Sequence, residues 1–104
     1  MRSAIAIFLA AWTLGASAQE VLNDRQLLGM RLFNQSCRVC HTKPQLVSPQ
    51  QYGPVLSKAT LGGQDDALRS FISDGTPRMP GFKFTYEPAQ IDAIVAYIKT
   101  MPAQ

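Results

Sequence analysis

The sequence predicts a small all-α domain, and two observations carry that prediction. Apolar residues recur at helical spacing in three segments, over about residues 23–36, 64–73 and 88–100. The chain between these segments is rich in proline, glycine and polar residues, a composition typical of irregular loops. We therefore expect three helices joined by loops.

The amino terminus predicts export. Arg2 precedes an apolar run over residues 4–14, and the small residues Ala16-Ser17-Ala18 follow. This order is typical of a secretory signal peptide, so we expect residues 1–18 to be cleaved off after Ala18. An uncleaved membrane anchor is the alternative, but such spans usually need about twenty apolar residues. The remaining residues 19–104 suffice for one domain with a modest core.

Charge patterning argues against a nucleic-acid-binding protein. The ten Lys and Arg residues are scattered and form no basic run. Nine of them remain once Arg2 is removed, against seven Asp and Glu, so the mature chain is only weakly basic. We expect no nucleic-acid partner and no membrane span in the mature form.

The first expected helix begins at Asn23, which forms a partial capping box with Gln26 three residues later. Its apolar face consists of Leu27, Leu28, Leu32 and Phe33. Gly29 lies inside this helix, where glycine costs about 1 kcal/mol relative to alanine. Such a glycine indicates a second helix crossing close to it, or simply a glycine that the helix tolerates.

Two cysteines and the only histidine of the chain follow in the motif Cys37-Arg38-Val39-Cys40-His41. Thiols at positions i and i+3 of a helical turn share one face, where they can add to the two vinyl groups of a single haem. We therefore predict one haem c per chain, attached through thioethers from Cys37 and Cys40, with His41 as an iron ligand. A disulfide or a thioredoxin-like Cys-x-x-Cys pair is the alternative, but no strand–helix–strand pattern surrounds the motif.

Residues 42–54 have no helical periodicity and contain Pro44, Pro49, Gly53 and Pro54, so we expect an irregular loop. A ligating histidine usually donates its second ring proton to an acceptor such as a backbone carbonyl. We expect the carbonyl of Pro54 to orient His41 in this way. A simple turn proline is the alternative.

A second helix is expected from about Gln64 to Ser73, with Gly75 as its C-terminal stop. Its inward residues are Ala67, Leu68, Phe71 and Ile72. Asp65 and Asp66 fall in the first turn, where the helix dipole favours negative charge. That position explains both carboxylates, so we expect no acid-base pair and no catalytic residue.

A methionine lies among glycines and prolines in the segment Gly75-Thr76-Pro77-Arg78-Met79-Pro80-Gly81-Phe82. This composition excludes a helix and predicts a stiff, extended loop. If a haem is bound by His41, a thioether held on such a loop can be the sixth ligand of the iron, so Met79 is the second candidate metal ligand. Met30 and Met101 better fit core or surface positions.

The last helix is expected over about residues 88–100. Pro88 suits the first helical position and Gln90 can reach back to the cap, although Thr85 competes with Glu87 as the cap residue. The apolar face consists of Ile91, Ile94, Val95 and Ile98. Tyr97, near the end of this helix, is expected to pack against Gly29.

Together the motifs resemble the small single-haem bacterial cytochromes c of class I over nearly all of residues 19–104. The resemblance is carried by Cys37-Arg38-Val39-Cys40-His41, Gly53-Pro54, Arg78-Met79-Pro80-Gly81-Phe82 and Gln90-Ile91-Asp92-Ala93-Ile94-Val95-Ala96-Tyr97. It implies a cytochrome c-like fold of three to four helices around one covalently attached haem, with the first and last helices crossing.

The resemblance also implies roles for single residues. The family's crossing contact maps onto Gly29, Phe33 and Tyr97, its axial methionine onto Met79, and its proline carbonyl onto Pro54. Many members bury a tryptophan near a haem propionate, and residues 19–104 contain none. The residues that could replace it are Tyr52, Arg78 and Tyr86.

These features predict a periplasmic electron carrier. With His41 and Met79 in the two axial positions, the iron can transfer one electron but has no open position for a substrate, so we expect no enzymatic activity. The alternatives are a haem enzyme or gas sensor with a displaceable Met79, and a dedicated cytochrome subunit of a periplasmic dehydrogenase.

The expected partners follow from this role. A periplasmic dehydrogenase or a membrane complex would donate electrons, and an oxidase or reductase would accept them. We expect a monomer. The basic residues nearest in sequence to the haem-binding positions are expected to steer acidic partners; they are Arg38, Lys43, Arg78 and Lys83. The alternative is that they are ordinary solvated surface residues.

Overall fold

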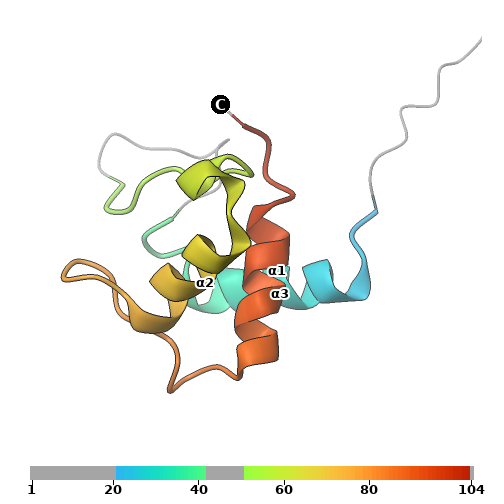
Figure 1. The fold of residues 1–104 in the computed structure, drawn as a ribbon. Helices are drawn as coiled ribbons and strands as arrows, with labels where there is room; N and C mark the ends of the chain where they lie inside the picture. The colour runs from blue at the N-terminus through green and yellow to red at the C-terminus, as the bar shows by residue number, and fades with distance from the viewer. Residues whose placement is uncertain (1–20, 42–50, 104) are drawn as a thin grey trace, which may run out of the picture.

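A computed structural model of the chain describes residues 21–41 and 51–103. Its elements are α1 (Asp24–Ser36), the short 3₁₀ helix η2 (Thr60–Gly63), α2 (Asp65–Asp74) and α3 (Pro88–Ile98), shown in Figure 1. The described residues form no strand, which confirms the predicted all-α class. Within these residues, no helix is long and apolar enough to cross a membrane. The predicted signal peptide, residues 1–18, lies outside the described residues.

The capping box predicted for α1 is present. The Asn23 side chain accepts from the backbone N–H of Gln26 (2.8 Å), and the Gln26 side chain accepts from the backbone N–H of Asn23 (3.0 Å). The prediction that Leu28 faces inward is wrong, because its side chain is 38% exposed. Successive residues lie about 100° apart round a helix, so Leu28 falls beside the buried stripe that contains Gly29.

The predicted crossing of the first and last helices is confirmed (Figure 1). A Cβ atom on Gly29 would lie 1.8 Å from the carbonyl oxygen of Ala93 and 2.9 Å from the Cβ of Tyr97, so only glycine lets the two backbones approach this closely. One turn later, the rings of Phe33 and Tyr97 meet edge to face, with centroids 5.4 Å apart.

α3 begins as its sequence predicts. Glu87 is the N-cap residue, Pro88 occupies the first turn, and the Gln90 side chain accepts from the backbone N–H of Glu87 (2.8 Å). Thr85 is therefore not the cap. The helix ends at Ile98, two residues earlier than expected, and all four predicted apolar positions are buried: Ile91, Ile94, Val95 and Ile98.

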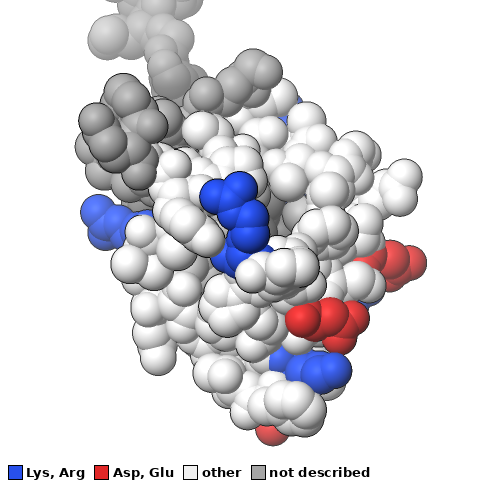
Figure 2. All heavy atoms as spheres, turned by 90° about the vertical axis from the view of Figure 1, so that its left-hand side faces the viewer, with Lys and Arg blue, Asp and Glu red and all other residues white. Residues whose placement is uncertain are grey.

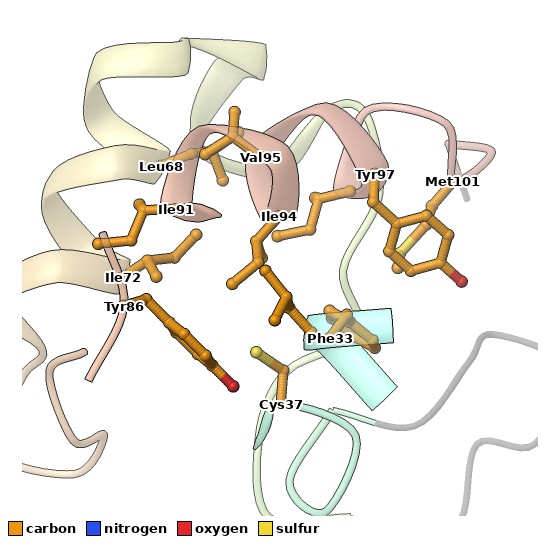
Figure 3. Packing of buried hydrophobic residues seen from close by; sticks show 12 residues of the cluster. Phe33, Cys37, Leu68, Ile72, Tyr86, Ile91, Ile94, Val95, Tyr97 and Met101 are labelled. Carbon is orange, nitrogen blue, oxygen red and sulfur yellow. The ribbon is translucent and has the colours of Figure 1, made fainter. Parts of the chain in front are cut away.

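The core lies on both sides of α3. Figure 3 shows Ile91, Ile94 and Val95 between α2, which contributes Leu68 and Ile72, and Phe33 of α1. Ile94 and Phe33 are almost completely inaccessible to solvent. Because α3 contacts both other helices, it fixes the position of α2 relative to α1.

α2 ends at Asp74, and the φ of 71° at Gly75, the residue after it, allows the chain to turn as predicted. Leu68 and Ile72 are buried, but Phe71 is 46% exposed, so the prediction that it points into the core is wrong. Phe71 lines an open cavity instead.

The segment after α2 differs from the extended loop that its prolines predict. Thr76 and Met79 form a tight turn, in which each donates its backbone N–H to the carbonyl of the other (2.8 and 3.1 Å). Pro77 takes the second position of this turn, where its fixed φ is favourable. The turn brings Met79 back beside the end of α2.

Candidate functional site

An apolar cavity of about 360 Å³ lies among the end of α1, the segment after residue 51, α2, the turn at residues 76–79, and α3. All five residues singled out from the sequence line it: Cys37, Cys40, His41, Pro54 and Met79. Much of the remaining wall is aliphatic or aromatic, and includes Phe33, Leu68, Phe71 and Ile94. The fold therefore brings together, around one space, segments that lie far apart in the sequence.

The cysteine motif continues α1 by one turn. The backbone N–H of Cys37 donates to the carbonyl of Phe33 (2.8 Å), and the backbone N–H groups of Cys40 and His41 both donate to the carbonyl of Cys37 (3.1 and 2.9 Å). This hydrogen bonding places the two thiols and the imidazole on a single turn, the arrangement that the spacing predicted. Both cysteines are free of disulfide bonds.

The two thiols have different surroundings. Cys37 is buried, whereas Cys40 is half-buried. Burial, with a smaller contribution from the nearby Cys40, raises the pKa of the Cys37 thiol to about 11. A thioether at this position has no proton to lose, so covalent attachment would remove this titration.

The His41 ring is held by the segment at Gly53 and Pro54. His41 Nδ1 lies 2.8 Å from the carbonyl oxygen of Pro54, which is the hydrogen bond expected from the sequence. Because a carbonyl only accepts, Nδ1 carries the proton, and the lone pair of the neutral ring is on Nε2. A Cβ on Gly53 would lie 2.7 Å from Nδ1 and Cε1, so glycine is needed next to the ring.

Met79 reaches the cavity from the turn that follows α2. Its side chain is half-buried and packs against the hydrophobic core. Among the methionines in the described residues, it alone lines the cavity. Met101 is buried elsewhere in the core, and Met30 packs at its edge, in agreement with the roles expected for them.

Two of the three residues considered as replacements for a tryptophan line the cavity. The guanidinium of Arg78 lies 5.3 Å from the centroid of the Tyr52 ring, a cation–π contact. Tyr86 has another role, since its hydroxyl is hydrogen-bonded to Ser36. Figure 2 shows one face of the molecule, on which Lys and Arg side chains lie near the centre.

Sequence reasoning missed two features of the site. Leu61, which lines the cavity, adopts φ 52° and ψ 38°, a left-handed conformation that leucine rarely takes. Gly62 and Gly63 indicate a left-handed turn here, but nothing in the sequence places Leu61 in it. The Ser36–Tyr86 hydrogen bond also has no local signal, because 50 residues separate its partners.

The residues of the cavity fit a covalently attached haem. Two thiols lie on one helical turn, an imidazole has its Nε2 lone pair available, and a thioether lines the same apolar space. Imidazole and thioether together form a ligand set that haem iron accepts. The exposed ring of Phe71 would be covered by a flat apolar group in the cavity.

A cavity with these residues in a small all-α domain is characteristic of c-type cytochromes. Residues 24–98 match the family model described as cytochrome c oxidase, cbb3-type, subunit III, and the chain belongs to this family. It is also similar to cytochrome c6 of Nostoc sp. (strain PCC 7120 / SAG 25.82 / UTEX 2576). The two are 30% identical over 99 residues, which cover 90% of this chain and 82% of that protein.

Solved structures confirm the cytochrome c-like fold. The c-type cytochrome SorU from Sinorhizobium meliloti superimposes with a TM-score of 0.59 at 24% identity, covering 75% of this chain and 91% of that one. A structure described as a point mutant of Kustc0563 gives 0.58 at 25% identity, covering 70% and 96%. Family membership indicates a covalently bound haem c and haem-based electron transfer.

Proposed function

We propose that this protein is a periplasmic electron carrier that binds one haem c through thioethers from Cys37 and Cys40, with His41 and Met79 as axial ligands. One observation carries the proposal: the two thiols, the imidazole and the thioether line the same apolar cavity. When bound, haem supplies an iron that gains and loses one electron.

The protein's own residues would control that iron. The Pro54 carbonyl fixes the tautomer and the plane of the His41 ring, and the turn at residues 76–79 presents Met79. With both axial positions taken, no position remains for a substrate, so the proposed role is electron transfer without catalysis. Methionine ligation and apolar walls favour ferrous iron, so we expect a positive reduction potential.

Export is part of the proposal. A signal peptide over residues 1–18 would deliver the chain to the periplasm, where the cysteines would otherwise tend to form a disulfide. Mass spectrometry of the exported protein should give the mass of residues 19–104 plus one haem. A product that retains residues 1–18 would contradict this part of the proposal.

The proposed electron donor is a periplasmic dehydrogenase or a membrane complex, and the proposed acceptor is an oxidase or reductase. We propose that this protein binds each of them as a monomer. Arg38 and Arg78 are exposed near the cavity, where they can attract an acidic partner surface. Lys83 contributes less, because it lies 3.5 Å from Asp74, and Lys43 lies outside the described residues. Association rates should therefore fall as salt concentration rises, whereas rates independent of salt would exclude steering.

The first experiment is an absorption spectrum of the haem-loaded protein, oxidised and reduced, with and without carbon monoxide. We expect a low-spin spectrum with the weak long-wavelength sulfur-to-iron band, unchanged by carbon monoxide and lost in Met79→Ala. A high-spin spectrum that shifts readily with carbon monoxide would overturn the proposal in favour of a haem enzyme or gas sensor.

A further inference from the structure

One side-chain hydrogen bond links the cysteine motif to the segment that carries Met79. The hydroxyl groups of Ser36 and Tyr86 are bonded to each other, and Ser36 is the last residue of α1, next to Cys37. Among the described residues, no other side-chain hydrogen bond joins residues 24–41 to residues 75–86. Figure 3 shows Tyr86 with its hydroxyl directed toward the segment of Cys37.

Tyr86 is firmly connected to the loop that precedes it. Its ring stacks on Phe82, with centroids 5.8 Å apart and an interplanar angle of 21°, and its backbone N–H donates to the Phe82 carbonyl (2.8 Å). Phe82 itself lines the cavity, as does Ser36. A displacement of Tyr86 would therefore be transmitted to the cavity wall three residues after Met79.

The other side of this loop rests on α2. The backbone N–H of Phe82 donates to the Ile72 carbonyl (2.9 Å), and a Cβ on Gly81 would lie 2.7 Å from the Ser73 carbonyl oxygen. These backbone contacts set the loop against α2 but not against the segment of Cys37 and His41. The Ser36–Tyr86 bond supplies that second connection.

We propose that Ser36 and Tyr86 are positioning residues for the axial methionine. Their hydrogen bond holds the Met79 loop in place relative to the segment of Cys37 and His41, and so determines how readily an external ligand displaces Met79 from the iron. The inference rests on the proposed function, because it needs Met79 to be an iron ligand.

The physical basis is the cost of separating two hydroxyls that meet in a partly buried contact. Tyr86 as a whole is only 7% exposed, so losing Ser36 as a partner would cost part of the free energy of this hydrogen bond. Opening the Met79 loop must break this bond, whereas a variant without it opens more easily. One net hydrogen bond corresponds to roughly a five- to tenfold change in the opening equilibrium.

The test is an imidazole titration of the ferric, haem-loaded protein at neutral pH, followed by loss of the sulfur-to-iron band. We expect Tyr86→Phe and Ser36→Ala each to bind imidazole about five- to tenfold more tightly than the wild type. The double variant should bind no more tightly than either single variant, because both substitutions remove the same bond. Ser36→Thr, which keeps a hydroxyl, should stay close to the wild type.

Tyr97→Phe is the matched control. Tyr97 is also 7% exposed, and its substitution by Phe removes a hydroxyl just as Tyr86→Phe does. Tyr97, however, lies at the α1–α3 crossing and does not line the cavity. Its imidazole affinity should equal that of the wild type. Thermal unfolding followed by circular dichroism measures global stability separately for every variant.

The outcomes separate the inference from the proposed function. Wild-type affinity in Tyr86→Phe and Ser36→Ala, with the band intact in the wild type, would overturn the inference and leave the electron-carrier proposal standing. An equal gain in Tyr97→Phe would also overturn it, since general loosening would then explain the effect. A wild type without the sulfur-to-iron band would overturn both.

Discussion

At the scale of single residues, the orientation of His41 depends on two neighbours in the sequence, Gly53 and Pro54. The carbonyl oxygen of Pro54 accepts a hydrogen bond from the ring, and Gly53 has no side chain that would collide with it. The backbone N–H of Gly53 also donates to the Cys40 carbonyl (2.9 Å), so the segment is tied to the cysteine motif beside the ring. The imidazole is thus fixed at one nitrogen and along one face, and Nε2 remains available for a metal.

Gly53→Ala should disturb this arrangement. The added Cβ would lie 2.7 Å from His41 Nδ1 and 2.8 Å from the Cys40 carbonyl oxygen, so the ring or the segment must move. We expect a weaker hydrogen bond to Pro54, a fraction of haem that is no longer low-spin, and a loss of about 1–3 kcal/mol in unfolding free energy. Absorption spectra and denaturant unfolding of the haem-loaded protein measure both effects.

Gly62→Ala is the control for that substitution. Its Cβ would meet no atom closer than 4.0 Å, but Gly62 has φ 67°. It should therefore cost about 1 kcal/mol through backbone strain and leave the spectrum unchanged. A wild-type spectrum in Gly53→Ala would show that the ring does not need the space that glycine leaves.

At the scale of the elements, the crossing of α1 and α3 depends on Gly29. In Gly29→Ala the new Cβ would lie 1.8 Å from the Ala93 carbonyl oxygen, a backbone atom that cannot rotate away. The helices must move apart, which also separates the Phe33 and Tyr97 rings. We expect a loss of about 3 kcal/mol or more in unfolding free energy, measured by denaturant unfolding.

Asn34→Ala in the same helix is the matched control. Asn34 is exposed, so the substitution changes helix propensity without adding an atom to the crossing. It should be neutral or slightly stabilising. Equal unfolding free energies for Gly29→Ala and the wild type would mean that the helices have room to adjust.

The contact between α3 and the start of α2 should be sensitive to acid. Lys99 Nζ lies 2.8 Å from both an Asp65 carboxylate oxygen and the Gly63 carbonyl oxygen. The hydrogen bond from Lys99 lowers the pKa of the Asp65 carboxyl below its ordinary value of 3.8. A lowered carboxyl pKa contributes stability that is complete above the unfolded-state pKa and lost as the pH falls through the folded-state pKa.

Lys99→Met should remove this contribution. When the pH is lowered from about 5 to about 3, the thermal unfolding temperature of the wild type should fall by more than that of the variant. The reason is that only the wild type loses the Asp65–Lys99 contact. Both side chains are exposed, so the difference should be small and should shrink in high salt. The same acid dependence in both proteins would mean that solvent screens this contact completely.

At the scale of the whole molecule, the helices were predictable because their signals are local. Asn23 with Gln26, Gly75, and Pro88 with Gln90 mark helix ends within four residues, and each does so in the structure. The Cys37–His41 motif was predictable because its residues are adjacent in the sequence. The Pro54 contact was predictable because a ligating histidine needs a hydrogen-bond acceptor for its second ring nitrogen, and a backbone carbonyl of the following loop is such an acceptor.

The features that escaped prediction depend on distant parts of the chain. Phe71 has the spacing of a core residue, but it lines the cavity and is 46% exposed. The Ser36–Tyr86 bond exists only because α1 ends beside the segment before α3. Helical periodicity indicates which residues avoid water, whereas tertiary structure decides whether protein or a bound group covers them.

The cavity makes the stability of the whole domain depend on its occupant. Without a bound group, the apolar walls of this cavity of about 360 Å³ would be left open to solvent. Small domains have about 5–15 kcal/mol of stability in total. A bound group that covers these walls would add to this total, so the chain without it should be less stable than the haem-loaded protein.

Cys37→Ser with Cys40→Ser, which prevents covalent attachment, tests this dependence in the exported protein. We expect reduced helix content by circular dichroism and a broad thermal transition, because the walls of the cavity lose their packing partner. Arg38→Gln, between the two cysteines, keeps both thiols and should load haem and unfold in one sharp transition. A sharp transition at the wild-type temperature in the double variant would show instead that the helices close the cavity themselves, and that α3 alone suffices to hold α1 and α2 together.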